Sequence, residues 1–343
     1  MAEHVIPRTL AEALDPAWLS AALAALTGGA PVTAVETVEV IRTVATKVRF
    51  TAAFEGAKAG KEAFCLKGFL DIDDSMTRGG FVETDFYAKL ASQLPVRLPA
   101  CVATVMNRET QQGIFIMRDL IDQGARFCTA LEPFSANHAA QSLEQLARLH
   151  ASRSLLDGHP WVRRRIAELA HMAYVTPSML QEMLDGPRGE GLSSQTRNAA
   201  LLLQGVRALA ARDEANQPVL VHGDCHAGNI FWTADGPGLI DWQVLQQGGW
   251  ALDVAYHIAA VLPIEVAETD ERALLDHYID AVRGFGGEAL DRENAWTQYR
   301  MSAVYGYYLW AITRRVEPSI IKTFVGRLGA SVARHGSFQL LGL

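Results

Sequence analysis

The chain has 343 residues, of which 49% are hydrophobic and 20% are charged, and its formal net charge is −7. This length exceeds one ordinary domain of roughly 100–200 residues, so we expect two lobes with a sizeable core. The composition is typical of globular proteins and excludes disordered and fibrous classes. The negative charge argues against general nucleic-acid binding, which depends on clustered Lys and Arg.

Nothing in the hydropathy pattern predicts a membrane protein. The strongly apolar runs, such as residues 305–312, are shorter than the ~20 residues that a spanning helix needs. The first four residues contain no basic region followed by an apolar stretch, so no secretory signal is expected. The four cysteines lack C-x-x-C spacing and are interpreted as reduced thiols. We therefore expect a cytoplasmic protein with no membrane partner.

The N-terminal third of the sequence predicts a β-rich lobe. A short helix with Asp15 as its N-cap comes first. Alternating β-branched runs between residues 31 and 70 predict three antiparallel strands, and an amphipathic helix follows over 79–94. Two further strands, over 100–106 and 113–119, complete the lobe.

The remaining sequence predicts mostly helices. Ser135 is a plausible N-cap for the first of them, and residues 185–198, rich in Gly, Pro and Ser, predict a surface loop. Short apolar strands over 218–221 and 238–240 flank a polar segment, and helices follow Trp250 to the end of the sequence.

The polar segment reads His222-Gly-Asp224-Cys-His226-Ala-Gly-Asn229, and a turn later the chain reads Ile-Asp241-Trp. Phosphoryl transfer needs a carboxylate to orient the attacking hydroxyl and oxygen ligands for magnesium. The oxygen donors Asp224, Asn229 and Asp241 meet that need. A zinc site built from His222, Asp224 and His226 is an alternative, although no further ligand pair accompanies these residues.

The pattern His-Gly-Asp-x-His-x-x-Asn followed by Ile-Asp-Trp resembles that of the aminoglycoside phosphotransferase and choline kinase superfamily, relatives of the protein kinases. The resemblance implies that Asp224 is the catalytic base and that Asn229 and Asp241 hold Mg²⁺. It also implies that His222 supports the loop through hydrogen bonds. The segment Gly-Trp-Ala-Leu-Asp253-Val-Ala-Tyr resembles a segment of the family in which an aspartate begins a helix and braces this loop. Asp253 is therefore expected to have a structural role.

The resemblance covers about residues 35–315 and implies an α+β, two-lobed protein kinase-like fold. We expect an N-terminal nucleotide-binding lobe over residues 1–120. A helical lobe over 121–343 is expected to carry the catalytic loop and the acceptor pocket. ATP and Mg²⁺ are the implied cofactors. A kinase acting on polypeptides is disfavoured because no His-Arg-Asp loop, Asp-Phe-Gly or Ala-Pro-Glu segment is found.

Kinases bind the nucleotide phosphates through a strand lysine that pairs with a helix glutamate. Lys67 lies on the third predicted strand, and Glu83 begins a phrase, Glu-Thr-Asp-Phe-Tyr, that resembles the family's acidic helix. The alternative is an edge-strand lysine and a solvated helical glutamate. The strand Ile-Phe-Ile-Met-Arg-Asp-Leu resembles the family's hinge, where adenine binds, and its expected contacts are Met117, Asp119 and Leu120.

One departure from the kinase pattern lies in the turn over residues 41–48, which has no glycine. Protein kinases cover the phosphates with a glycine-rich loop at this point. We expect Thr43, Thr46 and nearby backbone N–H groups to contact phosphate in its place. The missing glycines also support the alternative of a catalytically silent nucleotide-binding sensor or scaffold.

The expected partner is a small molecule with a hydroxyl acceptor, and two clusters of charge give opposite indications about it. Acidic residues outnumber arginines between Glu265 and Glu293, which suits a cationic aminoglycoside or an amino alcohol. Arg153 and residues 163–165 form a basic cluster that suits an anionic acceptor such as a hydroxyacyl thioester. A solvated helix face explains the acidic cluster equally well and is the more common explanation of a basic cluster of this kind.

The aromatic run from Tyr299 to Trp310 lies on a late predicted helix, where such side chains usually form core, and the alternative is that they line an apolar acceptor pocket. With the modest number of acidic groups elsewhere, this favours a broader class of hydroxylated metabolites over an antibiotic.

Overall fold

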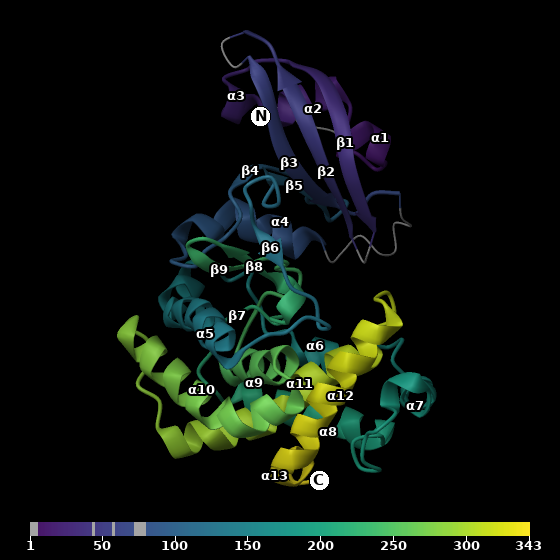
Figure 1. Cartoon of the computed structure of the whole chain (residues 1–343), viewed down its shortest axis with the longest axis vertical. Coiled ribbons are helices and arrows are strands. Elements are labelled where there is room, and N and C mark those ends of the chain that lie inside the picture. The colour runs from purple at the N-terminus through teal and green to yellow at the C-terminus, as the bar shows by residue number, and fades with distance from the viewer. Residues whose placement is uncertain (1–5, 43–44, 57–58, 72–79) are drawn as a thin grey trace. The chain divides into compact units, whose positions relative to one another are not determined.

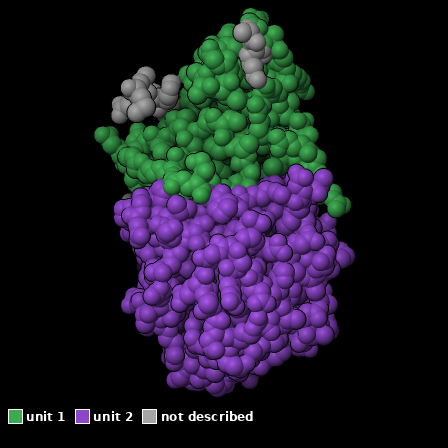
Figure 2. Space-filling view, turned by 90° about the vertical axis from the view of Figure 1, so that its left-hand side faces the viewer, with its two compact units in different colours: residues 1–93, 98–126, 241–243 green, residues 94–97, 127–240, 244–343 purple. Residues whose placement is uncertain are grey.

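The computed structural model describes residues 6–42, 45–56, 59–71 and 80–343. The chain divides into two compact units (Figures 1 and 2). The first unit comprises Met1–Gln93, Leu98–Arg126 and Asp241–Gln243, and the second comprises Leu94–Arg97, Phe127–Ile240 and Val244–Leu343. The segment Asp241–Gln243 therefore belongs to the first unit although its neighbours on both sides in the chain belong to the second.

The first unit is built on a five-stranded antiparallel sheet of order β1-β2-β3-β5-β4. Three short helices precede it, and one longer helix with a 3₁₀ turn follows β3. The elements are α1 (Leu10–Ala13), α2 (Pro16–Ala22), α3 (Ala24–Thr27), β1 (Val32–Arg42), β2 (Thr46–Phe54), β3 (Gly60–Gly68), α4 (Gly80–Lys89), η3 (Ala91–Gln93), β4 (Cys101–Asn107) and β5 (Gln112–Arg118).

One face of this sheet packs against α1–α3 (Figure 1). The residues of β2 alternate strictly between buried and half-buried, because successive side chains of a strand point to opposite faces. Val48 and Phe50 share a core with Leu19 and Leu23 of the N-terminal helices. The same alternation directs Lys47, between two buried residues, to the opposite face.

Helix α4 covers that opposite face. Tyr87 of α4 contacts Phe115 of β5, with ring centroids 4.7 Å apart. Thr84 approaches Gly113 so closely that a Cβ atom at position 113 would lie 2.4 Å from the Thr84 hydroxyl oxygen. The missing side chain of Gly113 therefore sets how near α4 lies to the sheet.

The second unit is mostly helical and contains two small sheets, one of β7 and β10 and one of order β6-β8-β9. Helix α9 is buried along its whole length, which fits a sequence that is apolar apart from Asp253, Tyr256 and His257. The elements are β6 (Arg126–Phe127), α5 (Ala136–Ala151), η4 (Arg153–Gly158), α6 (Ile166–Ala170), α7 (Pro177–Asp185), η5 (Pro187–Gly189), α8 (Ala199–Glu214), β7 (Val219–Val221), η6 (Ala227–Asn229), β8 (Ile230–Thr233), β9 (Gly236–Leu239), β10 (Gln246–Gly248), α9 (Ala251–Val261), α10 (Ile264–Gly284), α11 (Arg292–Ile312), α12 (Pro318–His335) and α13 (Ser337–Leu340).

Most predicted elements are present, and the predicted α+β class is confirmed. Asp15 caps α2 by accepting from the N–H groups of Ala17 and Trp18, and Ser135 caps α5 by accepting from His138. The predicted helix over 79–94 is shorter, since α4 ends at Lys89 and a 3₁₀ turn follows it.

Both short strands predicted around the polar segment are present with shifted bounds, as β7 and β9. Strand β7 pairs with β10, a strand that the sequence did not predict, and β9 begins at Gly236, two residues before the predicted start. Pro237 pairs with Trp232 there, which is tolerated because β9 is an edge strand. The surface loop predicted over 185–198 also contains the 3₁₀ turn η5. None of the helices in the described ranges combines the length and apolar character that crossing a bilayer requires.

The close approach at Gly113 yields a stability prediction. Gly113→Ala places a methyl group against Thr84, so α4 must shift, and we expect a loss of about 1–3 kcal/mol in the free energy of unfolding. Urea unfolding of the purified variant measures this loss. Gly284→Ala is the control, because a Cβ atom there meets nothing within 4 Å, and it should leave stability unchanged or slightly higher. Equal stability of both variants would contradict the proposed packing constraint.

Candidate active site

The first unit contains a buried cluster of charges around Lys67 of β3. The Lys67 Nζ lies 2.6 Å from Glu83 Oε2 and 2.8 Å from Asp241 Oδ1. The backbone N–H of Trp242 donates to Glu83 Oε1 at 3.1 Å, and the Trp242 ring stacks on Phe86 of α4 with centroids 4.1 Å apart. Glu83 thus contacts both the lysine and the peptide that follows Asp241.

The charges in this cluster alter one another's pKa values. Burial acts to lower the pKa of Lys67, but the Asp241 and Glu83 carboxylates outweigh it and raise that pKa. Burial acts to raise the pKa of Asp241, but Lys67 and Lys47 hold it well below its usual range. Burial raises the pKa of Glu83, and the negative charge of Asp241 raises it further. The contact with Lys67 acts in the opposite direction but does not outweigh these two effects. Asp241 is therefore the carboxylate that remains firmly ionised.

Lys47 of β2 is a second cation in this cluster, and the sequence analysis did not identify it. It pairs directly with Lys67 in the register of β2 and β3, and its Nζ lies 3.1 Å from Asp241 Oδ2. Each oxygen of Asp241 therefore meets a different ammonium group.

The residues expected to contact adenine lie at the end of β5. Met117 is buried and pairs with both Cys65 and Cys101. Asp119 is engaged through its side chain by Arg49, at 2.9 Å, and its N–H donates to a backbone carbonyl in β3. The carbonyl of Leu120 accepts from a backbone N–H five residues later. Adenine binding by this segment stays a prediction, and it must use backbone groups other than these.

Thr46 is buried, and its hydroxyl donates to the carbonyl of Leu70 at 3.1 Å. A phosphate contact by this hydroxyl would have to replace that hydrogen bond. Thr43, the other hydroxyl expected there, lies outside the described residues.

In the second unit, the loop that carries Asp224 is braced by the buried carboxylate of Asp253. The carboxylate accepts the backbone N–H groups of His222 at 2.7 Å and Gly223 at 2.8 Å, and His150 Nε2 donates to it at 3.1 Å. Burial acts to raise the pKa of Asp253, but these hydrogen bonds and the nearby histidines lower it overall. The brace is therefore an ionised group fully surrounded by donors.

The loop also depends on Gly223 having no side chain. Its φ is +83°, and a Cβ atom at this position would lie 2.5 Å from the carbonyl oxygen of Val244. The hydroxyl of Tyr305 donates to the Gly223 carbonyl at 2.9 Å. The backbone N–H and the carbonyl of Gly223, the residue before Asp224, are therefore both hydrogen-bonded.

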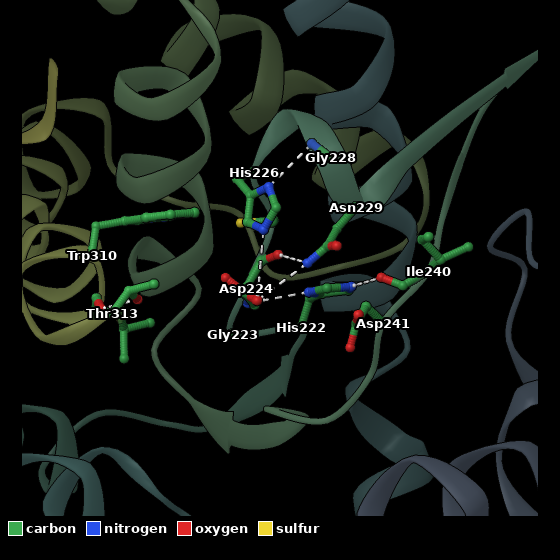
Figure 3. A network of polar contacts seen from close by, with 12 residues as sticks. His222, Gly223, Asp224, His226, Gly228, Asn229, Ile240, Asp241, Trp310 and Thr313 are labelled. Carbon is green, nitrogen blue, oxygen red and sulfur yellow. Dashed lines mark hydrogen bonds and ion pairs between the residues drawn. The ribbon is translucent and has the colours of Figure 1, made fainter. Parts of the chain in front are cut away.

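Asp224 lies at the centre of a polar network (Figure 3). The Tyr256 hydroxyl donates to Asp224 Oδ1 at 2.8 Å and accepts from Trp310 Nε1 at 2.5 Å. The side-chain amide of Asn229 donates to the Asp224 carbonyl at 2.8 Å and to Asp224 Oδ2 at 3.2 Å. The Asp224 side chain remains 30% exposed, unlike the buried groups that hold it.

Both histidines of the loop contact Asp224, and His226 does so through Nε2, which lies 3.8 Å from Asp224 Oδ2. His222 accepts the Asp224 N–H at Nδ1 and donates from Nε2 to the carbonyl of Ile240, the residue before Asp241. His226 Nδ1 accepts from the Gly228 N–H, which caps the 3₁₀ turn η6. No group of three or more His, Cys, Asp and Glu residues in the described ranges is arranged to hold a metal ion, which weighs against the zinc alternative.

The donor atoms of Asn229 and Asp241 suit a hard cation. The amide nitrogen of Asn229 is committed to Asp224, so a cation would meet the amide oxygen. Asp241 offers an ionised carboxylate at a residue with φ +68°, and the Ile240 N–H before it donates to the Asn229 carbonyl at 3.0 Å. Carboxylate and amide oxygens are the ligands that Mg²⁺ prefers, so each of these side chains, taken by itself, offers an oxygen that fits the ion.

The model of the phosphotransferase enzyme family, APH, matches residues 82–292, more than half of the chain. The chain belongs to this phosphotransferase family. The resemblance inferred from the loop sequence is therefore confirmed. A comparison with curated proteins gives no match.

Two solved structures show the same fold as this phosphotransferase. A choline/ethanolamine kinase family protein from Mesorhizobium loti is 16% identical, with a TM-score of 0.52, and the alignment covers 94% of this chain and 93% of that one. The GDP complex of aminoglycoside 2′-phosphotransferase-IIIa is 12% identical, with a TM-score of 0.50, and covers 93% and 99%. The predicted kinase-like fold, with a β-rich N-lobe and a helical C-lobe, is confirmed.

One buried histidine, His257, makes the stability of the second unit sensitive to acid. His257 Nδ1 donates to the Cys225 carbonyl at 2.7 Å, and burial lowers the pKa of His257 to about 4. An unfolded histidine has a pKa of about 6.5, so the unfolded chain binds the extra proton between these values. The stability that neutral His257 contributes is complete above about pH 6.5 and is lost as the pH falls towards 4.

We predict that His257→Gln flattens the decline in the free energy of unfolding between pH 6.5 and 4. The difference in that decline from the wild type should approach about 3 kcal/mol, measured by urea unfolding at a series of pH values. His171→Gln, at an exposed position, is the control and should keep the wild-type decline. An unchanged decline in His257→Gln would show that His257 is not a source of acid sensitivity.

Proposed function

We propose that this phosphotransferase moves the γ-phosphoryl group of ATP, bound with Mg²⁺, to a hydroxyl group of a small molecule. The observation that carries the proposal is the constraint on Asp224. Its carboxylate is held by Tyr256 and Asn229, on a loop that Asp253 braces, and it is still partly exposed. A fixed and accessible carboxylate is the group that orients an attacking hydroxyl and accepts its proton.

The remaining roles follow from the charges. Lys67, supported by Glu83, binds the α- and β-phosphates, and Asn229 and Asp241 hold the metal ion. Magnesium, when bound, neutralises charge that develops on the transferred phosphoryl group. His222 keeps Asp224 and Ile240 in fixed positions through its two ring nitrogens. The first unit serves as the nucleotide-binding lobe and the second carries the acceptor pocket.

The charge distribution of the helical unit supports a neutral hydroxylated metabolite as the acceptor, because several charges of both signs already have partners. In the basic cluster, Arg164 contacts Asp213 and Arg163 contacts Glu168.

Several of the carboxylates that suggested a cationic acceptor already have partners within the chain. Glu271 contacts Arg334 at 2.7 Å, and Arg292 contacts both Asp276 and Asp280. These acids are thus less available to attract a polycation such as an aminoglycoside. Amino alcohols and hydroxyacyl thioesters are also candidate acceptors, and the assay below includes both.

Asp224→Asn should lower acceptor-dependent release of nucleoside diphosphate by about a hundredfold or more, because the proton acceptor is lost. The assay uses ATP and Mg²⁺ with a panel of aminoglycosides, amino alcohols, sugars, hydroxyacyl thioesters and hydroxylated lipids. Asp235→Asn, at an exposed position in the turn between β8 and β9, is the matched control and should retain wild-type turnover. Intact turnover in Asp224→Asn would refute the assigned role.

The same assay addresses the alternative of a catalytically silent sensor. Binding of ATP with no release by any acceptor, over the whole panel, would favour that alternative. Failure of the wild type to bind any nucleotide would refute both proposals.

Tyr256→Phe should lower kcat about tenfold while leaving nucleotide affinity unchanged, because a hydrogen bond to a charged group is removed from Asp224. Steady-state kinetics and direct nucleotide binding separate the two effects. Tyr307→Phe is the control, since this buried tyrosine donates to the backbone carbonyl of Thr196 and does not contact Asp224. An equal fall in kcat in both variants would indicate general disturbance of α9 and α11.

A further inference from the structure

Two lysines lie directly opposite each other in the sheet of the first unit. Lys47 of β2 and Lys67 of β3 are paired in the antiparallel register, so their side chains emerge on the same face. Like charges in directly opposed positions destabilise a sheet unless other groups compensate them. The two lysines therefore need anions close to them, and the carboxylates of Glu83 and Asp241 supply these.

The two lysines differ in how many of these anions they contact. Lys67 is 3% exposed and contacts both Glu83 Oε2, at 2.6 Å, and Asp241 Oδ1, at 2.8 Å. Lys47 is 24% exposed and contacts Asp241 Oδ2 at 3.1 Å. If another cation binds Asp241, Lys67 therefore keeps its contact with Glu83, whereas Lys47 loses its contact with Asp241.

Asp241 is the carboxylate assigned to the metal ion in the proposed function. A metal ion bound to it displaces a lysine contact, and Lys47 is the lysine that moves at lower cost, because its side chain already reaches solvent. Once displaced, Lys47 is an uncompensated ammonium group facing Lys67. An anion that arrives together with the metal ion restores the balance, and a nucleotide phosphate is such an anion.

We propose that Lys47 is a second phosphate-binding cation, which occupies Asp241 in the free protein and transfers to the nucleotide phosphates when the metal and nucleotide bind. This inference rests on the proposed function. It also accounts for the glycine-free turn that precedes β2: a side-chain ammonium group supplies the phosphate contact that backbone N–H groups of a glycine-rich loop supply in protein kinases.

The test compares Lys47→Met with Lys61→Met, which removes an exposed lysine of β3 that pairs with Glu36. Calorimetry measures binding of ATP, ADP, AMP and adenosine with and without Mg²⁺, and electron paramagnetic resonance measures Mn²⁺ binding to the free protein. In Lys47→Met we expect ATP affinity to fall about tenfold, because a charge-assisted hydrogen bond is lost. Adenosine affinity should be unchanged, and Mn²⁺ should bind more tightly, because its competitor for Asp241 is gone.

Opposite effects on metal and phosphate, absent in Lys61→Met, support the inference, as does recovery of ATP affinity in Lys47→Arg. Wild-type ATP affinity in Lys47→Met overturns it. An equal loss for adenosine and ATP also overturns it, since that outcome indicates a disturbed fold, and the thermal unfolding midpoint of the variant checks the fold independently. If the wild type binds adenosine and ATP equally weakly, the proposed function fails as well, which distinguishes that failure from one confined to Lys47.

Discussion

The ammonium group of Lys67 is buried, and an unpaired buried charge is among the most costly features a fold can contain. Its compensation governs the arrangement of the first unit. Glu83 must come from a helix on the same face of the sheet, and Asp241 must come from a segment more than a hundred residues away in sequence. The stacking of Trp242 on Phe86 and the hydrogen bond from Trp242 to Glu83 secure that segment. Membership of residues 241–243 in the first unit thus follows from a requirement for charge balance.

The second unit applies the same physical principle with the opposite sign. Asp253 is a buried carboxylate surrounded by N–H donors, and it holds the backbone of His222 and Gly223 in place. The buried Asp253 and the partly exposed Asp224 differ in role. Groups that position the loop are removed from water, whereas the group assigned to the chemistry can still be reached by a substrate.

The sequence was informative where the signal is local. The strand alternation, the caps at Asp15 and Ser135, and the loop motif could all be recognised within short windows. The pairing of Lys67 with Glu83 was expected from resemblance, and the observed distance agrees with it.

Contacts that depend on register and helix packing could not be found in this way. Lys47 meets Asp241 because a hairpin places it opposite Lys67, and hairpin register is not encoded in the composition of either strand. Tyr256 reaches Asp224, and His150 reaches the bracing carboxylate of Asp253, through the packing of α9 and α5. For Tyr256 one signal was available: it lies three residues after Asp253, on the same side of a helix.

The contacts of Asp224 also limit the directions from which its carboxylate can be approached. Tyr256 occupies a lone pair of one oxygen, and Asn229 approaches the other, beside which His226 Nε2 also lies at 3.8 Å. The directions that remain for a further donor are therefore restricted. A substrate with several hydroxyl groups presents each of them from a different direction once its body is bound. The expected outcome for such a polyol is regioselectivity, with one hydroxyl phosphorylated and its neighbours left free. The choice between them would then follow from the hydrogen bonds around a single carboxylate as much as from the shape of the pocket.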